Sequence, residues 1–434
     1  MLSKEENELL CRVGPGTPAG NLMRRYWMPV LHSWELPAPD CAPIRVRLLG
    51  EDLVAFRDTS GRVGFLEEGC PHRLASLWLG RNENNGLRCV YHGWQFDVEG
   101  NCIDQMNEPE SFANKIKAVA YPALERGGVI WAYMGPAELR PPPPDFEYTR
   151  VDENHRAVTK VWQECSWLQA LEGGIDTSHA PILHRAFGAG GAGIASTSAF
   201  VRGKAPTLDV DFTDYGYRYT GVRELDEDQQ YVRGYHFVMP FTQLRPGQNV
   251  GRDNAERPMV AGHHWVPIDD HNCMVWNWHY SYGDHVLEGD ERVLDASGNG
   301  PTHVDKSNQF RAYGNSGNGW LVDRDVQKTK TFTGIPGINA QDRAVQESMG
   351  NIVDRSREHL GPADRAIISA RRILTNAVRA VERGETPAGA NTSYYNVRAS
   401  EKIFARDIPW REVLLPEMYP EGERQLAEAV VPGS

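Results

Sequence analysis

The chain has 434 residues, enough for two or more domains that each bury a core. Its 58 acidic and 46 basic residues give a formal net charge of −12, which argues against nucleic acid or an anionic membrane as the main partner. The chain contains no run of about 18 apolar residues, so no membrane span is predicted, and the first residues lack the pattern of a signal peptide. Seven irregularly spaced cysteines argue against a disulfide framework, so a reducing cytoplasm is the expected location.

Residues 27–140 are predicted to form a small all-β domain. Short runs of β-branched and aromatic residues alternate with Gly, Asp and Asn, which is the pattern of strands joined by turns. The clearest runs are 44–49, 52–57, 62–66 and 128–134. Four consecutive prolines follow at 141–144 and form a stiff spacer. A Pro-rich linker, and with it a domain boundary, is therefore expected at 141–146.

Two cysteine–histidine pairs lie within this predicted all-β domain. Cys70 precedes His72 by two residues, and Cys89 precedes His92 by three. Two thiolates and two imidazoles are the ligand set of a Rieske [2Fe–2S] centre, in which two histidines replace two cysteines on one iron. Zinc sites of the Cys₂His₂ type instead pair cysteine with cysteine and histidine with histidine. A one-electron carrier is therefore predicted, with a zinc ribbon or two chance pairs in structural loops as the alternatives.

Residues 147–434 are predicted to form a second domain with both helices and strands. The apolar spacing of residues 161–172 predicts an amphipathic helix, and residues 207–282 contain strand-like segments. The Gly- and Asn-rich stretch 283–320 is expected to be a long excursion, and residues 339–384 are expected to be helical. Because strands and helices do not alternate regularly, the fold class is predicted to be α+β.

Two histidines early in the second domain, His179 and His184, are five residues apart. On a straight helix this spacing places them about 140° apart, so one helix cannot present both to a single ion. Pro181 between them is expected to break the helix and let the imidazoles converge. Two histidines and a carboxylate form the facial triad of non-haem Fe(II) oxygenases. The pair alone is a weak signal, because surface or core histidines are common, but a cluster upstream strengthens it: an electron carrier and an electron-consuming iron explain each other.

Taken together, these motifs resemble the oxygenase (α) components of Rieske non-haem iron oxygenases, and within them the phthalate dioxygenase branch. The resemblance extends to residues 16–29, 176–184 and 337–342 and covers nearly the whole length. It implies an N-terminal all-β Rieske domain and a helix-grip-type catalytic domain with an antiparallel sheet and helices. It also implies that a helical segment at residues 1–26 packs on the catalytic domain.

The resemblance further implies a role for each site residue. Four residues would hold the Rieske cluster and three the mononuclear iron: Cys70, His72, Cys89 and His92 for the cluster, and His179, His184 and Asp342 for the iron. Asp176 would link an iron-ligating histidine to a Rieske histidine of the neighbouring subunit, so a homotrimer or a stack of trimers is the smallest working unit. Glu347 is the alternative to Asp342, although five residues along a helix it should face elsewhere. Asp342 could also serve only as an acid in a first helical turn.

A glycine-rich segment and two arginines bear on cofactor and substrate. Residues 188–193 match G-x-G-x-x-G but lack the flanking strand and helix of a dinucleotide site, so a loop over the iron pocket is the preferred interpretation. An aromatic carboxylate substrate would need a cation, and arginine binds carboxylates with two hydrogen bonds. Arg202 and Arg245 are the candidates, although a given arginine is more often a solvated surface residue.

The predicted function is NAD(P)H- and O₂-dependent cis-dihydroxylation of an aromatic carboxylate such as a phthalate. The chain has no flavin or nicotinamide motif, so the electrons are expected from a separate flavin/iron–sulfur reductase. One alternative is a Rieske monooxygenase that demethylates or cleaves an aryl ether of an aromatic acid. The other is an electron-transfer protein without oxygenase activity. About three irons per chain would indicate an oxygenase, and about two a carrier.

Overall fold

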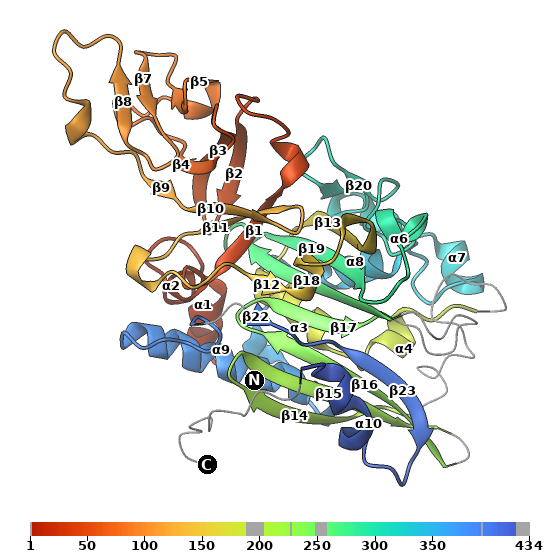
Figure 1. Ribbon diagram of the computed structural model, residues 1–434. Coiled ribbons are helices and arrows are strands. Elements are labelled where there is room, and N and C mark those ends of the chain that lie inside the picture. Colours follow the sequence, from red (N-terminus) through yellow and green to blue (C-terminus); the bar gives the residue numbers. More distant parts are fainter. Residues whose placement is uncertain (1, 188–203, 226–227, 248–257, 392–393, 422–434) are drawn as a thin grey trace. The chain divides into compact units, whose positions relative to one another are not determined.

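The structure is a computed structural model that describes residues 2–187, 204–225, 228–247, 258–391 and 394–421 (Figure 1). The chain divides into a smaller unit, Val13–Pro144, and a larger unit formed by Met1–Arg12 and Asp145–Ser434. The domain limits expected from the sequence stay predictions. Each unit has its own sheets and core and is described by itself.

The smaller unit is built from three small antiparallel sheets and one short helix, α2 (Pro18–Met23). The sheets have the strand orders β1-β11-β10, β2-β3-β4-β9 and β5-β6-β7-β8. Their strands are β1 (Trp27–His32), β2 (Ile44–Leu48), β3 (Glu51–Arg57), β4 (Val63–Glu67), β5 (Arg81–Glu83), β6 (Gly86–Arg88), β7 (Trp94–Phe96), β8 (Cys102–Gln105), β9 (Ala120–Tyr121), β10 (Ala123–Arg126) and β11 (Val129–Tyr133). The four strands singled out in the sequence are confirmed as β2, β3, β4 and β11.

The larger unit contains a ten-stranded sheet with the order β14-β15-β16-β17-β18-β19-β13-β21-β20, to which β23 is added beside β16. Every pairing is antiparallel except that of β13 with β21. The strands are β13 (Arg156–Gln163), β14 (Thr207–Thr213), β15 (Gly216–Glu224), β16 (Gln229–Val238), β17 (Thr242–Pro246), β18 (Met259–Pro267), β19 (Cys273–Ser281), β20 (Val304–Asp305), β21 (Arg311–Ala312) and β23 (Ser400–Ala405). A separate pair joins β12 (Asp145–Phe146) to β22 (Tyr394–Tyr395). The expected antiparallel sheet is confirmed.

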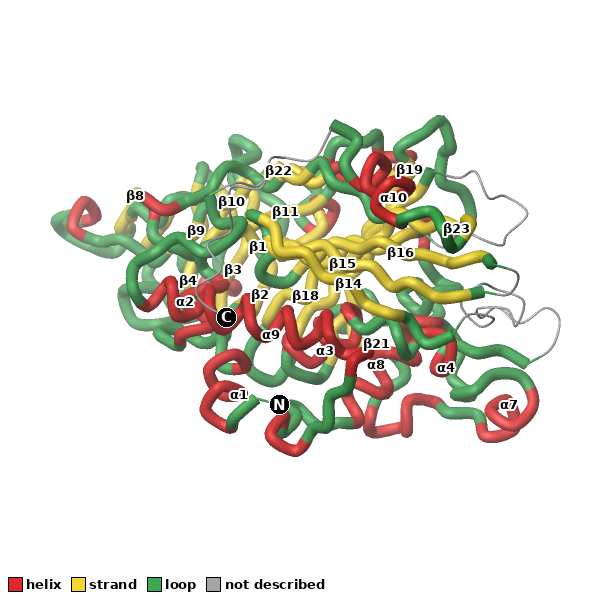
Figure 2. The backbone as a smooth tube through the Cα atoms, turned by 90° about the horizontal axis from the view of Figure 1, so that it is seen from below, coloured by secondary structure: helices red, strands yellow, loops and turns green. Residues whose placement is uncertain are grey.

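Helices cover both faces of this sheet (Figure 2). On one face lie α3, α8 and α9, and on the other lies α10, which contacts β16 and β23. The helices described in the larger unit are α1 (Lys4–Cys11), α3 (Trp167–Ile175), α4 (Ala180–Leu183), α6 (Asp290–Val293), α7 (Arg324–Thr329), α8 (Ile338–Ser348), α9 (Arg365–Glu382) and α10 (Trp410–Met418). Helix α1 packs on α3 and α9, and the indole of Trp167 donates to the carbonyl of Leu10 over 3.1 Å.

The prediction of a helix at residues 161–172 is wrong for the first half of that range. Residues 161–163 end strand β13, which pairs with β19 along its full length, and the helix begins only at Trp167. A short apolar run fits a strand and a helix equally well. Pairing with β19 satisfies the backbone of these residues, and only the register of the sheet reveals it.

Successive residues of β18 point to opposite faces of the sheet. His263 and Trp265 face α3, because a Cβ atom on Gly174 of that helix would come within 2.1 Å of the Trp265 ring. His264 faces the other way, where its Nε2 lies 3.0 Å from the hydroxyl of the buried Tyr148. The face beneath α3 is the one that carries the candidate site.

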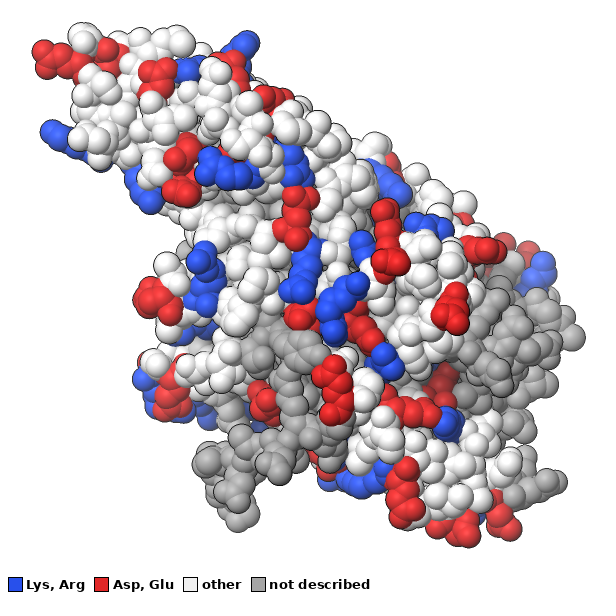
Figure 3. All heavy atoms as spheres, in the orientation of Figure 1, with Lys and Arg blue, Asp and Glu red and all other residues white. Residues whose placement is uncertain are grey.

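No helix within the described ranges is long and apolar enough to cross a membrane. On the face drawn in Figure 3, acidic and basic side chains are interspersed. On this face, the acidic residues that give the net charge of −12 do not form one continuous acidic patch.

Candidate functional site

The two histidines singled out in the sequence flank the short helix α4. His179 occupies its N-cap position and His184 its C-cap position. The prediction that Pro181 breaks a helix between them is wrong: this proline stands in the first turn of α4, where a missing N–H costs no hydrogen bond. The chain bends earlier, at the end of α3, where Asp176 takes an extended conformation with ψ of 118°.

The third residue, Asp342, lies on α8. Gly337 precedes this helix with φ of 85°, a conformation that glycine adopts without strain. A Cβ atom at Gly337 would also lie 2.6 Å from the Cα of Gly298. The turn therefore needs glycine, and it sets where α8 starts and which of its side chains face α4.

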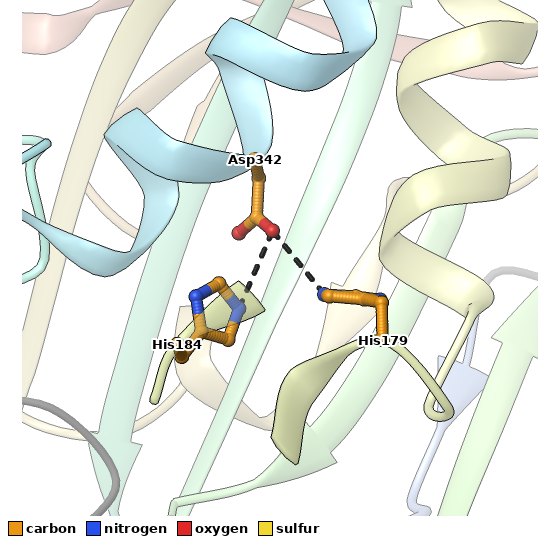
Figure 4. A group of neighbouring side chains, drawn as sticks. All are labelled: His179, His184 and Asp342. Carbon is orange, nitrogen blue, oxygen red and sulfur yellow. Dashed lines mark ion pairs between the residues drawn. The ribbon is translucent and has the colours of Figure 1, made fainter. Parts of the chain in front are cut away.

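His179, His184 and Asp342 converge on one point (Figure 4). One carboxylate oxygen of Asp342, Oδ1, lies 3.2 Å from Nε2 of His179 and 3.4 Å from Nε2 of His184. The three potential donor atoms all lie within 4.8 Å of one another. This is the arrangement in which one ion can meet two imidazoles and one carboxylate.

The chemistry of this group fits a cation at its centre. Asp342 Oδ1 is buried and has no hydrogen-bond partner within the described residues, although both imidazoles lie close to it. Burial lowers the pKa of His179, but Asp176 and Asp342 outweigh burial and raise it to about 10. Two carboxylates around the imidazoles thus favour a positive charge, which a divalent metal ion supplies. The two-histidine, one-carboxylate set is the one that non-haem Fe(II) uses.

Each histidine is oriented by a second residue. Nδ1 of His179 lies 3.3 Å from Asp176, whose other oxygen accepts two bonds of 2.7 Å from the backbone and hydroxyl of Ser178. Nδ1 of His184 lies 2.8 Å from Oε1 of Gln341. Gln341 Nε2 donates to the carbonyl of Ile335, so its oxygen must face His184 and accept the Nδ1 proton. Both histidines are therefore held with Nε2 toward Asp342.

Glu347, the alternative carboxylate, lies elsewhere on α8. Its Oε1 accepts from the backbone of Glu164 over 3.0 Å, and its Oε2 accepts from the indole of Trp320 over 2.6 Å. It takes no part in the group of Figure 4. The geometry brings Asp342, and not Glu347, to the two histidines.

In the smaller unit, the two cysteine–histidine pairs sit in two loops of matching construction. The residue four positions after each cysteine donates its N–H to the cysteine carbonyl: Leu74 to Cys70 over 2.8 Å and Gly93 to Cys89 over 2.9 Å. Both of these donors have positive φ, 60° at Leu74 and 78° at Gly93. The loops therefore turn back on themselves in the same way.

The four side chains of these loops converge as a cluster would require. Cys70 and Cys89 are 1% and 2% exposed and lie beside each other in the core of the unit, and the rings of His72 and His92 have centroids 4.4 Å apart. His72 Nδ1 is buried without a hydrogen-bond partner in the described chain. Burial, and to a lesser degree the neighbouring Cys89, raises the pKa of Cys70 to about 12. A thiolate here needs the positive charge of iron, and the donor set fits a Rieske cluster.

Of the two candidate substrate arginines, Arg202 lies outside the described residues. Arg245 is half-buried on β17, and its Nε donates to Nε2 of His263 over 3.2 Å. Burial, and then the charge of Arg233, lowers its pKa to about 10, while the charge of Asp342 raises it. Arg245 is thus a cation within electrostatic reach of the group in Figure 4. The glycine-rich segment 188–193 also lies outside the described residues.

Sequence reasoning missed Gln341, His263 and Asn277. Gln341 directly precedes Asp342 and carries no signal of its own in the sequence. His263 and Asn277 lie on neighbouring strands, and only the register of β18 with β19 places them opposite each other. No spacing in the sequence could have found them.

Two comparisons cover most of the chain. Residues 26–119 match the family described as Rieske [2Fe-2S] domain, and residues 132–430 match the one described as LigXa C-terminal domain like. The chain is 40% identical over 433 residues to the phthalate 4,5-dioxygenase oxygenase subunit of Pseudomonas putida, covering 95% of this chain and 94% of that protein. It is 38% identical over 431 residues to the 3-chlorobenzoate-3,4-dioxygenase oxygenase subunit of Comamonas testosteroni, covering 94% and 97%.

A solved structure shares the fold. Dicamba monooxygenase bound to dicamba matches with a TM-score of 0.58 and 19% identity, over 84% of this chain and 99% of that one.

The two family models and the two relatives show that the chain belongs to the oxygenase (α) subunits of the Rieske non-haem iron oxygenases. These subunits contain a [2Fe–2S] cluster and a mononuclear Fe(II), consume O₂ and receive electrons from NAD(P)H through a partner reductase.

Proposed function

We propose that this subunit catalyses the NAD(P)H- and O₂-dependent cis-dihydroxylation of an aromatic carboxylate, with a phthalate-like acid as substrate. The observation that carries the proposal is the cation Arg245, half-buried and within electrostatic reach of Asp342. A guanidinium that is already desolvated binds a carboxylate with two charge-assisted hydrogen bonds. The names of the phthalate and chlorobenzoate relatives, both aromatic acids, support the same substrate class.

The proposed ligands follow from the two convergent groups. Cys70, His72, Cys89 and His92 would hold the cluster, and His179, His184 and Asp342 the mononuclear iron. When bound, the cluster supplies single electrons, and the iron leaves coordination positions open for O₂ and substrate. Asp176 orients His179, and Gln341 orients His184. Arg245 would anchor the carboxylate and so set which ring carbons face the iron.

The reaction balances with one O₂ and one NAD(P)H for each product. NAD(P)H and one proton supply two electrons and two hydrogens through the reductase, and NAD(P)⁺ is released. Both oxygen atoms form C–O bonds to adjacent ring carbons and end as the two hydroxyl groups of a cis-dihydrodiol.

We further propose that the working unit is a homotrimer in which Asp176 links His179 to a Rieske histidine of the neighbouring subunit. Co-expression of a Cys89→Ala chain with an Asp342→Ala chain tests this arrangement. Each chain alone should be inactive, and mixed oligomers should regain part of the activity, because an intact cluster then faces an intact iron site on another subunit. Mixed oligomers without any activity would refute the transfer between subunits.

Monooxygenation of an aromatic acid is the second candidate. The chain is also 33% identical over 406 residues to the 5,5'-dehydrodivanillate O-demethylase oxygenase subunit of Sphingobium, covering 89% of this chain and 83% of that protein. Such a reaction inserts one oxygen atom and sends the other to water.

Turnover under ¹⁸O₂ separates the two reactions. The holoenzyme with a surrogate reductase is given phthalate, 3-chlorobenzoate and a methoxybenzoate, and the products are analysed by mass spectrometry. We expect two labelled atoms in one product of a non-methoxylated acid. Formaldehyde release from methoxybenzoate, with no diol from the other acids, would replace the dioxygenase proposal by the demethylase.

A further inference from the structure

Arg245 differs from Arg233 and Arg218, two arginines on neighbouring strands of its sheet, in the partner that holds it. Arg233 on β16 pairs with Glu401 over 3.2 Å, and Arg218 on β15 pairs with Asp211 over 3.0 Å. Arg245 instead donates its Nε–H to a histidine, His263. Among the described residues no carboxylate lies within ion-pair distance of it, so none of them compensates its positive charge by direct contact.

The protonation of His263 follows from its other neighbour. Asn277 Nδ2 donates to the carbonyl of Val275 over 3.3 Å, so Asn277 Oδ1 is the atom that faces His263 Nδ1, at 2.9 Å. An amide oxygen only accepts, so Nδ1 of His263 carries the hydrogen. Its Nε2 then has a free lone pair, which accepts from Arg245. Burial, and then the charge of Arg245, lowers the pKa of His263 to about 3, in agreement with a neutral ring.

The register of the sheet builds this chain of hydrogen bonds. His263 pairs directly with Asn277 on β19 and with Gln243 on β17, and Arg245 is two residues beyond Gln243. Residues two apart on a strand share a face. Gln243 is itself tied to α3, because its Nε2 donates to the carbonyl of Gly174 over 2.8 Å. The row Gln243–His263–Asn277 is therefore a rigid base beside the cation.

We propose that His263, held in one tautomer by Asn277, is the positioning residue of Arg245 and a determinant of specificity for carboxylate substrates. Its neutral Nε2 fixes the guanidinium through Nε and leaves both Nη groups, and the uncompensated charge, to the carboxylate of the substrate. The inference rests on the proposed function, because it assigns the orientation of the substrate-binding cation.

His263 can position Arg245 without competing with the substrate because its imidazole is neutral. A carboxylate in the place of His263 would bind the guanidinium and compete with the substrate for it. An apolar side chain would leave Nε without an acceptor and the guanidinium free to turn. A protonated imidazole would present a hydrogen to the Arg245 Nε–H. Only a neutral acceptor both holds the arginine and leaves its charge available.

The test compares anaerobic binding of benzoate and benzamide to the holoenzyme by calorimetry, because the two probes differ in charge but little in shape. His263→Glu and His263→Leu should weaken benzoate binding about 10- to 100-fold, the range expected for a lost charge-assisted hydrogen bond, and leave benzamide unchanged. His263→Gln keeps an acceptor at the same reach and should restore benzoate binding. His264→Gln is the matched control: His264 is also buried and lies on the same strand but points to the opposite face.

Steady-state kinetics give a second readout. The His263→Glu variant should raise KM for the carboxylate substrate by a larger factor than it lowers kcat, because the iron ligands are untouched. Thermal unfolding of all variants identifies any that do not fold. If either His263→Glu or His263→Leu does not fold, the other carries the comparison with His263→Gln and His264→Gln.

Two results overturn the inference in different ways. If Arg245→Met abolishes benzoate binding but both His263→Glu and His263→Leu bind benzoate as tightly as the unmodified protein, His263 has no positioning role and the proposed function stands. If the unmodified protein binds neither benzoate nor phthalate, or if Arg245→Met binds them normally, the carboxylate assignment fails and the inference fails with it.

Discussion

Replacing Gln341 by leucine removes the acceptor that holds His184. In the structure, Oε1 of Gln341 lies 2.8 Å from Nδ1 of His184, and both side chains are buried. Leucine has a similar volume but no acceptor, so the Nδ1 proton is left without a partner. The proton can then move to Nε2, the nitrogen that faces Asp342, and the imidazole is no longer prepared to bind a metal ion.

Two arguments give the same magnitude for this change. Leaving a buried donor unsatisfied costs about 1–3 kcal/mol. Loss of the residue that orients a metal-binding histidine lowers metal affinity by about 10- to 100-fold, which corresponds to about 1.4–2.8 kcal/mol. We therefore expect the Kd for Fe(II) of the Gln341→Leu protein to rise by one to two orders of magnitude, while the cluster in the smaller unit is unaffected.

Competition with a chromogenic Fe(II) chelator under anaerobic conditions measures this Kd, and the visible absorbance of the cluster reports that the smaller unit is intact. Gln346→Leu is the matched control, because Gln346 lies on the same helix, is 5% exposed against 6% for Gln341, and accepts from Gln163 rather than from a histidine. Gln341→Glu keeps the acceptor and should bind iron well. Equal Fe(II) affinity in the Gln341→Leu and Gln346→Leu proteins would refute the reasoning.

Three further predictions concern electron transfer, iron and stability. Asp176→Asn should keep about three irons per chain. Reoxidation of its reduced cluster by O₂ in the presence of substrate, monitored by stopped-flow absorbance, should nevertheless slow severely. Reoxidation at the normal rate would exclude the bridging role of Asp176. Chelation of the mononuclear iron should abolish product formation with the cluster absorbance intact, and Fe(II), but not Zn(II), should restore it; activity without that iron would contradict the site. Glu172→Gln should lower the free energy of unfolding by about 3–5 kcal/mol at neutral pH, measured by urea unfolding, because Arg355 and Arg371 are buried against this carboxylate. Burial raises the pKa of Glu172, but these two arginines outweigh burial and lower the pKa below its ordinary 4.5. The stabilisation by the ionised carboxylate is therefore present above pH 4.5 and is lost as the pH falls through the lower pKa of the folded state. Equal acid-unfolding midpoints for the unmodified and Glu172→Gln proteins would disprove this stabilisation.

The sequence predicted elements best where a local pattern decides the structure. Strands β2, β3, β4 and β11 alternate and end at turn residues, and the long apolar stripe of α9 has the helical period. The sequence pattern predicts a helix at residues 161–163, because their strand partner, β19, lies more than a hundred residues further along the chain and leaves no local signal. The expected helical region 339–384 is two helices, α8 and α9.

The same distinction holds for the candidate site. His179, His184 and Asp342 carry chemistry that their spacing and family resemblance make recognisable. Gln341 and Asn277 are ordinary amides, and what they do depends on which neighbour their oxygen faces. Arg245 could be named as a candidate, but its orientation depends on strand register, which the sequence alone does not define.

Helix α8 supplies two consecutive residues to the proposed iron site, Gln341 and Asp342, whereas the proposed substrate-binding cation, Arg245, comes from β17 and its support from β18 and β19. On these two proposals, metal binding and substrate recognition are carried by separate elements of the same unit. A substitution on the strands can change the charge or shape that the substrate meets while the iron ligands keep their positions. This division gives a structural route by which one iron centre can serve dioxygenases and demethylases of different aromatic acids. It also means that redesign of substrate range should begin on β17 and β18, with α4 and α8 left unaltered.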